Sequence, residues 1–325
     1  GARRVLVVGT DWAAVTIIGA IGRYAHPVYD IRGVIAEPDD VLAELCDVPV
    51  VGTGADIGQL VEQQHISELI VSSTRELSGE TFQGVMDAYE KGAAIVPMPL
   101  LYERITGQVP VEHVSNNWAV VFPIDGISIF NLYPQMKRLL DIILALVAAL
   151  PFVLLLPFLA LAIRLDSPGG IFYSQERTGL NGRIFRIYKF RSMQADAEQT
   201  TGAVFSKPGD ARVTRVGRFM RKTRLDELPQ IWNVLRGDMS IVGPRPERPE
   251  HLQRLTEKIP FYRTRLVIRP GLTGWAQVRY GYGSTDEDAL VKLQYDLYYV
   301  RHQSLILDVN IIIRTVGKVL RMSGV

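Results

Sequence analysis

Cysteine and histidine are scarce in this sequence, with one cysteine and five histidines in 325 residues. The single cysteine, Cys46, excludes a disulfide within the chain and is typical of a reducing compartment. With so few soft ligands a zinc site is not expected. The formal net charge is only +2, so the chain as a whole is not expected to bind a polyanion, and nucleic acid is not an expected partner.

A complete dinucleotide-binding fingerprint is also missing. The apolar segment at residues 3–8 is followed by Gly9-Thr10-Asp11, which keeps only the first glycine of G-x-G-x-x-G. The second glycine normally lets the backbone approach a pyrophosphate, whereas Asp11 places a negative charge there. No Tyr-x-x-x-Lys pattern occurs in this region, which weakens the alternative of a NAD-dependent sugar-nucleotide dehydratase. The pattern favours a first domain that is regulatory or structural.

Charge is absent from Ile142 to Ile163, the only long apolar run of the chain. About 20 apolar residues suffice for a helix to span a bilayer. Pro151 and Pro157 each remove a backbone donor, so a kink is expected near the middle of the run. Basic residues flank both ends, and charge therefore gives no direction across the membrane. Three interpretations remain open: a core helix, a straight span, and a re-entrant helix that bends at Pro151 and returns to the cytoplasmic face.

The N-terminal part of the sequence alternates between expected strands and helices. Such alternation predicts a parallel sheet with helices on both faces. Strands are expected at residues 3–8, 31–36, 48–51, 68–72 and 93–97, and helices from residue 12 to about 24, at 57–64 and at 81–91. The predicted fold class is α/β: a Rossmann-like domain at 1–98, a connector at 99–134 with a short hairpin or a packing strand near Trp118, and a mostly helical α+β domain at 135–325.

The second half shows different signals. Two strands, at 172–175 and 184–190, are expected around an Asn181-Gly182 turn. Helices are expected at 212–221, 227–235, 287–300 and 305–320. Thr223 or Asp226 is the expected N-cap of the second of these helices, and Gly237 its end. The last helix is amphipathic, which fits either core packing or the membrane interface.

Two adjacent carboxylates, Asp226 and Glu227, lie in the segment RLDELPQ at residues 224–230. An ionised Asp226 can act as a nucleophile on phosphorus if cations screen the phosphate charge, and Glu227 suits Mg²⁺. The plain alternative is an N-cap followed by a glutamate that favours the helix dipole.

Basic residues favour the chemical interpretation, because arginine forks match phosphate geometry. Pro244 and Pro246 restrict the backbone on both sides of Arg245 and so present its guanidinium at low entropic cost. The basic set comprises Lys189, Arg191, Arg218, Arg221, Lys222, Arg224 and Arg245.

Several segments in this half resemble one known family. They are KRLLD at 137–141, DSPGGIFYSQERTG at 166–179, YKFRSM at 188–193, RKTRLDELPQIWNVLRGDMSIVGPRP at 221–246 and RPGLTGWAQV at 269–278. Residues 136 to about 324 resemble the bacterial sugar transferases of the monotopic phosphoglycosyl transferase superfamily. These polyprenyl-phosphate sugar-1-phosphate transferases start exopolysaccharide and O-antigen assembly. The Rossmann-like domain ahead is similar to the large form, whose members usually carry N-terminal transmembrane helices, so the chain is expected to be a piece of a longer protein.

The resemblance implies a set of residue roles. Asp226 is the implied nucleophile, and Glu227 supports the nucleophile or a Mg²⁺ ion held by Asp226 and Glu227. Arg221 is implied to contact the lipid phosphate and Arg245 the nucleotide-sugar, with Lys189 as a charge partner of Asp226. We also expect Arg191, Arg224, Pro244 and Pro246 to contribute to substrate binding.

The resemblance further implies a re-entrant membrane helix at about residues 137–165, broken at a proline. Pro151 and Pro157 are the expected break positions, although Leu150 stands where the family often has a serine before the proline.

The implied reaction transfers a sugar-1-phosphate from a UDP-sugar to undecaprenyl phosphate through an aspartyl-phosphosugar intermediate and releases UMP. The expected location is the bacterial inner (cytoplasmic) membrane, with the active site on its cytoplasmic face. Lipid of that membrane is an expected partner, and a homodimer is possible. A membrane-anchored, nucleotide-sensing scaffold without catalysis is the alternative.

Overall fold

The computed structural model describes residues 2–40, 42–72, 77–111, 132–194, 210–281, 283 and 285–321. The chain divides into two compact units, residues 1–123 and 124–325. The hairpin or packing strand expected near Trp118 lies outside the described residues.

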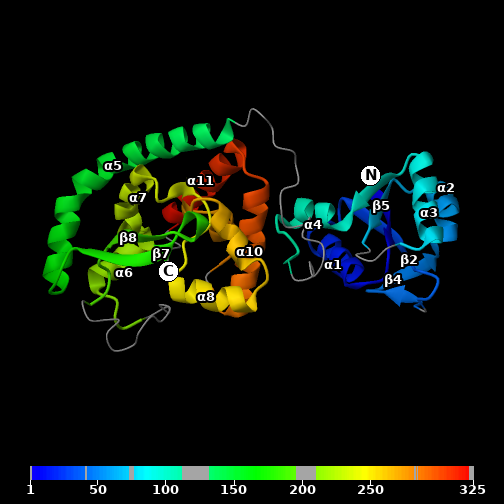
Figure 1. The fold of residues 1–325 in the computed structure, drawn as a ribbon, viewed down its shortest axis with the longest axis horizontal. Coiled ribbons are helices and arrows are strands. Elements are labelled where there is room, and N and C mark those ends of the chain that lie inside the picture. The colour runs from blue at the N-terminus through cyan, green and yellow to red at the C-terminus, as the bar shows by residue number, and fades with distance from the viewer. Residues whose placement is uncertain are drawn as a thin grey trace. The chain divides into compact units, whose positions relative to one another are not determined.

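The first unit is built on a six-stranded sheet with the order β3-β4-β2-β1-β5-β6 (Figure 1). Its strands are β1 (Arg3–Val8), β2 (Tyr29–Ile35), β3 (Glu44–Leu45), β4 (Val48–Gly52), β5 (Glu68–Val71) and β6 (Ala94–Pro97). All neighbours pair in parallel except β3, which runs antiparallel to β4. The parallel sheet was predicted. The edge strand β3 was not, because two residues carry no periodic pattern.

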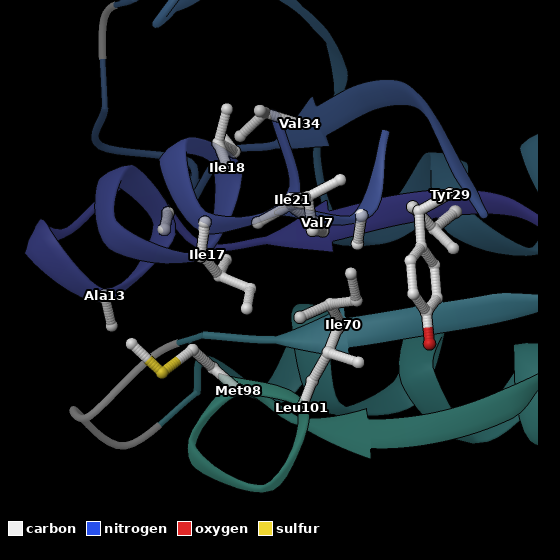
Figure 2. Packing of buried hydrophobic residues seen from close by; sticks show 14 residues of the cluster. Val7, Ala13, Ile17, Ile18, Ile21, Tyr29, Val34, Ile70, Met98 and Leu101 are labelled. Carbon is white, nitrogen blue, oxygen red and sulfur yellow. The ribbon is translucent and has the colours of Figure 1, made fainter. Parts of the chain in front are cut away.

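Helices cover both faces of this sheet, as the alternation along β1 requires. Val5 and Val7 pack on the face covered by α1 (Trp12–Ala20) and α4 (Met98–Thr106). Leu6 and Val8 pack on the opposite face, which α2 (Ile57–Gln64) and α3 (Gly79–Glu90) cover. Figure 2 shows the first face, where α1 and α4 side chains meet those of the sheet. The remaining helical segments are the π-helix η1 (Ile21–Ala25) and the 3₁₀ turn η2 (Gly54–Asp56).

Helix α4 occupies residues that the sequence analysis placed in a connector. Met98 and Leu101, three residues apart on one helical face, are fully buried against α1 and β5. The first unit therefore includes this helix, and the expected connector of residues 99–134 begins later than its pattern indicated.

The N-terminus of α1 is capped by Asp11. Its Oδ1 accepts hydrogen bonds from the backbone N–H groups of Ala13 and Ala14, at 3.2 and 3.3 Å. In dinucleotide-binding folds a pyrophosphate takes this place at the helix N-terminus. Here the amides are satisfied from within the chain, by a group of the same sign of charge as a pyrophosphate.

The second unit contains one long helix, two short strand pairs and a group of shorter helices. The strands β7 (Phe172–Thr178) and β8 (Ile184–Phe190) form an antiparallel hairpin, and β9 (Ser240–Val242) pairs in parallel with β10 (Gly271–Thr273). The helices are α5 (Tyr133–Asp166), α6 (Arg215–Thr223), α7 (Ile231–Arg236), α8 (Pro249–Lys258), α9 (Trp275–Arg279), α10 (Asp286–Arg301) and α11 (Leu305–Leu320), and the 3₁₀ segments are η5 (Leu180–Gly182), η6 (Leu225–Gln230) and η7 (Tyr262–Val267).

The helix expected at 227–235 is divided into η6 and α7. Pro229 lies inside η6 and has no N–H to continue an α-helical ladder, which explains the division. Neither expected residue caps α7, because Gln230 occupies the N-cap position and the Thr223 hydroxyl donates back to the Phe219 carbonyl at 2.9 Å. Gly237 ends α7 as predicted, in the left-handed region with φ 96°.

Helix α5 carries Pro151 and Pro157 inside one continuous, bent helix (Figure 1). Among the described helices, α5 alone is long and apolar enough to cross a membrane by length and composition. One stripe of the helix, which includes Ala145 and Ile163, packs on the rest of the second unit. Most of the other apolar side chains of α5 are exposed. Only 6% of the most apolar 18-residue stretch of α5 is buried. A core helix would be mostly buried, so this exposure argues against the core-helix interpretation.

Both ends of α5 are hydrogen-bonded to the same unit. Near its start, Asp141 Oδ1 accepts from the Ser240 hydroxyl at 3.0 Å and from the Ile241 backbone N–H at 2.9 Å. At its end, Asp166 Oδ2 accepts from the Val216 backbone N–H at 2.8 Å. The two flanks of the apolar run are therefore held by one folded body.

Two glycines of the first unit allow a test of its packing. A Cβ on Gly84 of α3 would lie 2.0 Å from the Gly54 carbonyl oxygen, whereas a Cβ on Gly19 of α1 would meet nothing within 4 Å. We expect Gly84→Ala to destabilise the first unit by at least about 1 kcal/mol through overpacking. Gly19→Ala should stabilise it by about 0.5–1 kcal/mol, because alanine is the better helix former.

Hydrogen exchange of peptides from the first unit measures both effects locally. Equal protection in Gly84→Ala and Gly19→Ala would contradict the close packing of α3 on η2.

Candidate active site

The adjacent carboxylates lie in η6, directly after a sharp reversal of the chain. Arg224 ends α6 with φ 60°, in the left-handed region that is costly for a residue with a Cβ. This turn sets η6 at the end of α6 and against β8. Asp226 and Glu227 are both buried there. A strained backbone beside two buried carboxylates is typical of a functional site.

Three cationic side chains converge on one oxygen of Glu227. Lys189 Nζ lies 3.0 Å from Glu227 Oε1, Arg245 Nη2 lies 3.2 Å from it, and Arg224 Nη1 lies 3.9 Å from it. Burial alone would raise the pKa of Glu227, but Lys189, Arg245 and Arg224 outweigh it and hold this pKa well below its usual range. Glu227 is therefore ionised, and its negative charge holds the three cationic side chains in place through ion pairs.

Asp226 has the opposite electrostatic character. Burial, followed by the charge of Glu227, raises the pKa of Asp226 to about 6, although Lys189, Arg221 and Arg224 oppose the rise. Its Oδ1 is buried without a hydrogen-bond partner. The two carboxylates thus differ: one is neutralised by ion pairs, and the other keeps an unused acceptor. Perturbed, divergent pKa values in a buried pair are characteristic of reactive groups.

Arg245 lies in the loop between β9 and α8, which hydrogen bonds hold in place. The Gly243 N–H donates to the Thr273 carbonyl at 2.8 Å, and the Gly271 N–H donates to the Pro244 carbonyl at 2.8 Å. A Cβ on Gly243 would lie 2.4 Å from the Arg269 carbonyl oxygen, so only glycine permits this approach. The strand pair holds the loop on one side of the site.

Two arginines that the sequence analysis did not select hold the same loop from the other side. Arg265 Nη2 donates to the Arg245 carbonyl at 3.0 Å, and Arg177 Nη1 donates to the Pro246 carbonyl at 3.1 Å. Arg265 is itself buried and ion-paired with Asp296 and Glu247, at 2.7 and 3.3 Å. Arg177 lies in DSPGGIFYSQERTG (166–179), one of the segments that resemble the known family, so the sequence could have indicated it. Arg265 stands in no such motif.

Two of the predicted residues, Lys189 and Arg191, also make contacts that the sequence did not indicate. Lys189 donates its hydrogen bond to Glu227, and its positive charge also acts on Asp226, where it opposes the rise of the pKa. Arg191, expected to bind substrate, is buried and donates to the carbonyls of Ser167 at 2.8 Å and of Pro168 at the end of α5. Its position gives it a structural role, because it satisfies carbonyl groups that the helix end leaves unpaired.

Most of the predicted residues, Lys189 and Arg191 included, gather around one cavity of about 1220 Å³. The residues that line it include Asp226, Glu227, Lys189, Arg191, Arg221, Arg224 and Arg245. Pro244 and Pro246 line a small adjacent void together with Arg245. Arg221 Nε also donates to the Ser192 hydroxyl at 3.0 Å. The cavity exceeds the usual 300–1,000 Å³ of small-molecule sites, so its size permits a ligand as large as a nucleotide-sugar.

The residues present fit a hard cation only in part. Across the described ranges, no three carboxylate, histidine or cysteine side chains cluster in a way that could hold a metal by themselves. The unpartnered Oδ1 of Asp226 is suited to a Mg²⁺ ion that takes its other ligands from water and phosphate. Glu227 Oε1 already faces three cations, so Asp226 is the better placed of the two predicted ligands.

Comparison with known proteins finds related sequences. The family model described as bacterial sugar transferase matches residues 132–322, which include α5 and every residue of the candidate site.

Curated relatives match over different lengths. A UDP-N-acetylgalactosamine-undecaprenyl-phosphate N-acetylgalactosaminephosphotransferase of Aeromonas hydrophila is 40% identical over 77% of this chain and 59% of its own length. A UDP-glucose:undecaprenyl-phosphate glucose-1-phosphate transferase of Xanthomonas campestris pv. campestris is 34% identical over 98% of this chain and 66% of its own. The exopolysaccharide production protein PSS of Rhizobium leguminosarum bv. phaseoli is 42% identical over 56% of this chain and 93% of its own. The chain thus spans about three-fifths to two-thirds of the length of the first two relatives.

The raised pKa of Asp226 predicts how stability depends on pH. Between its ordinary value of 3.8 and about 6, the folded state holds the proton more tightly than the unfolded chain. The free energy of unfolding therefore falls as pH rises through this window, and at neutral pH the buried carboxylate costs stability. We expect Asp226→Asn to raise the stability at pH 7.5 by up to about 3 kcal/mol and to lose this advantage as pH falls towards 4.

Thermal unfolding of both proteins across this pH range measures the difference. Asp286→Asn is the matched control, because Asp286 lies outside the cavity and forms ion pairs with Arg254 and Lys258 at 2.6 Å. An Asp226→Asn protein that is less stable than the parent at pH 7.5 would contradict the assigned environment.

Proposed function

Because the chain belongs to the bacterial sugar transferase family, we propose that it transfers a sugar-1-phosphate from a UDP-sugar to undecaprenyl phosphate. The names of its relatives in Aeromonas hydrophila and Xanthomonas campestris pv. campestris describe this type of reaction with different sugars. The reaction would be an early membrane step in exopolysaccharide or O-antigen assembly.

One observation carries the proposal: a buried aspartate with an unused oxygen faces a cavity lined by cations. Asp226 Oδ1 has no hydrogen-bond partner, and Arg221, Arg224 and Arg245 line the same cavity. A diphosphate brings negative charge, and these guanidinium groups offset it while the carboxylate approaches phosphorus. A purely sensory site would not require a carboxylate in a position that repels the ligand.

The chemistry takes two displacement steps. An oxygen of Asp226 attacks the β-phosphorus of the UDP-sugar, the bond from that phosphorus to the bridging oxygen breaks, and UMP leaves. An oxygen of undecaprenyl phosphate then attacks the same phosphorus, the bond to Asp226 breaks, and undecaprenyl-diphosphate-sugar forms. Arg221 is proposed to face the lipid phosphate and Arg245 the nucleotide-sugar. The covalent intermediate predicts ping-pong kinetics.

Mg²⁺ is proposed as the cofactor. Asp226, whose Oδ1 has no hydrogen-bond partner, would hold the ion, and the ion would supply positive charge to offset the negative charge of the leaving phosphate. In this scheme Glu227 acts at a distance, because it holds Lys189, Arg224 and Arg245 in place through its own ion pairs.

We propose that α5 enters one leaflet of the bacterial inner membrane and returns to the cytoplasmic face. Its exposed apolar surface favours lipid contact, and its two ends are bonded to one folded unit. An acceptor phosphate at headgroup level then comes within reach of a site that stays in water, while its long apolar tail remains in lipid.

The nucleophile assignment predicts the effect of one substitution on activity. Asp226→Asn should lower the release of UMP from a UDP-sugar by at least roughly a thousandfold, because the amide cannot form the intermediate. Asp286→Asn should retain the parent's rate. The assay uses purified protein with Mg²⁺, a panel of UDP-sugars and a short-chain polyprenyl phosphate.

Intact-mass analysis provides a second readout of the same step. The parent protein, incubated with UDP-sugar but without acceptor, should gain the mass of one sugar-phosphate, and Asp226→Asn should not. Near-normal turnover by the variant would overturn the assignment, and no UMP release from any UDP-sugar would favour a non-catalytic scaffold.

The proposed path of α5 predicts that both of its flanks lie on one side of the membrane. In a Cys46→Ser background, Leu132→Cys and Gly170→Cys introduce one thiol before and one after the apolar run. Both positions are exposed, and a Cβ at Gly170 meets nothing closer than 3.6 Å. In sealed vesicles a membrane-impermeant maleimide should label the two variants from the same side. Labelling from opposite sides would establish a straight span.

A further inference from the structure

One side of the cavity that Asp226 lines is mostly apolar. Four residues of α11 line it at the spacing i, i+3, i+4, i+7, which places them on one face of the helix. They are Ile312, Thr315, Val316 and Val319. Leu272 of β10 and Ala276 of α9 continue the lining. The Thr315 and Thr273 hydroxyls share a hydrogen bond at 2.7 Å, which joins α11 to β10. The surface that this side offers a ligand is therefore mostly hydrocarbon.

The apolar lining continues from α11 towards α5. Ile241, which also lines the cavity, belongs to two apolar clusters of this unit. One cluster includes Ile312 of α11, and the other includes Ala148 of α5 and Ile231. Ala148 and Ile231 line the cavity as well. A ligand with an apolar chain could thus follow this lining to the helix that is proposed to enter lipid.

A cation lies at the border of the apolar lining. Lys318, which precedes Val319, lines the same cavity, and its Nζ donates to the Gln277 carbonyl at 3.1 Å. Gln277 directly follows Ala276. The hydrogen bond therefore holds the amine next to the hydrocarbon surface.

Lys318 lies near a second cation, Arg224. Helix α11 contacts α6, whose C-cap residue is Arg224. Burial, followed by the charge of Arg224, lowers the pKa of Lys318. Two positive charges that approach each other in this way cost free energy, and an anion bound by both would offset that cost.

Arg224 retains positive charge that it can offer to an anion. Its Nη1 lies 3.9 Å from Glu227 Oε1, whereas Lys189 and Arg245 approach the same oxygen to 3.0 and 3.2 Å. Arg224 is thus the least tightly paired of the three. Its charge also opposes the rise of the pKa of Asp226. An anion held by Arg224 would therefore lie within electrostatic reach of the proposed nucleophile.

We propose that Lys318 is a further substrate-binding residue, which together with Arg224 holds the phosphate of the polyprenyl acceptor. The apolar lining between α11 and α5 then receives the first isoprenyl units of its tail. This inference rests on the proposed function. It places Lys318 in the second displacement only, in which an oxygen of the acceptor phosphate attacks phosphorus and the bond to Asp226 breaks.

The nucleotide-sugar fits this side of the cavity less well. Its uridine and its sugar, on either side of the diphosphate, both carry polar groups, which lose hydrogen bonds against hydrocarbon. A polyprenyl phosphate has one charged end and one apolar chain. The two cations beside an apolar lining match that distribution.

A purely structural role is the competing explanation for Lys318. Gln277 lies in the short helix α9, and a lysine that donates to a carbonyl near a helix C-terminus is a common cap. The two explanations differ in what the loss of the amine changes. A cap affects the stability of the fold, whereas an acceptor site affects the KM for the acceptor alone.

The two half-reactions separate these explanations. The full chain, in a neutral detergent, carries Lys318→Gln or Lys318→Arg. Arg321→Gln is the matched control, because Arg321 is the exposed C-cap residue of the same helix and does not line the cavity. Thermal unfolding of each variant shows whether the fold is intact.

We expect Lys318→Gln to raise the KM for farnesyl phosphate at least about tenfold, because a charge-assisted hydrogen bond to the phosphate is lost. The gain of one sugar-phosphate from UDP-sugar without acceptor should keep the parent's rate. Lys318→Arg should retain most of the acceptor affinity, and Arg321→Gln all of it.

Three outcomes would overturn the proposal: an unchanged KM for farnesyl phosphate in Lys318→Gln, an equal rise in Arg321→Gln, or a slower gain of sugar-phosphate in Lys318→Gln. The third would place Lys318 on the donor side of the reaction.

Calorimetric titration with farnesyl phosphate tests the same site without catalysis. Lys318→Gln should bind it at least about tenfold more weakly than the parent, whereas farnesol, which lacks the phosphate, should bind both proteins equally. Equal binding of farnesyl phosphate by both proteins would overturn the acceptor site. If the titration depends on Lys318 but the parent releases no UMP from any UDP-sugar, the proposed transfer fails and the acceptor site stands.

Discussion

The candidate site depends on the ion pairs of Glu227. Lys189, Arg224 and Arg245 converge on one oxygen of this buried carboxylate. Removing one partner of such a group is destabilising, because it leaves buried charge uncompensated. These cations come from β8, from the turn after α6 and from the loop after β9. One side chain thus brings together three separate parts of the chain, and Asp226 beside it is left with the unused oxygen that a reaction requires.

The same unit holds the long apolar helix at both ends. Asp141 and Asp166 accept backbone N–H groups near its two ends, and Arg191 satisfies carbonyls just beyond it. Arg191 directly follows the strand that carries Lys189. The residues that line the candidate site and those that hold α5 are therefore neighbours in one segment. In the proposed membrane arrangement, the fold and not a flexible linker sets the distance between the site and the lipid.

The sequence predicted the elements with strong periodic patterns and missed those that depend on partners distant in the chain. The alternating strands of the first unit and the hairpin of β7 and β8 carry their own signal. The burial of α4 does not, because it arises from packing on α1. In the site, the motif around Asp226 indicated the chemistry. It could not indicate that Lys189 pairs with Glu227, that Arg191 serves the end of α5, or that Arg177 and Arg265 hold the backbone around Arg245, since each depends on which groups the fold brings within 3 Å or so of one another.

Helices that cross a bilayer must match its thickness, and a mismatch is relieved by tilting or by deforming the lipid. At 34 residues α5 is about 50 Å long, well beyond the hydrocarbon core of about 30 Å. Because its ends are bonded to a single body and not to opposite surfaces, its length places no demand on lipid chain length. In the proposed re-entrant arrangement, the protein would suit membranes of varied acyl composition. It would respond to the packing of one leaflet rather than to the thickness of both.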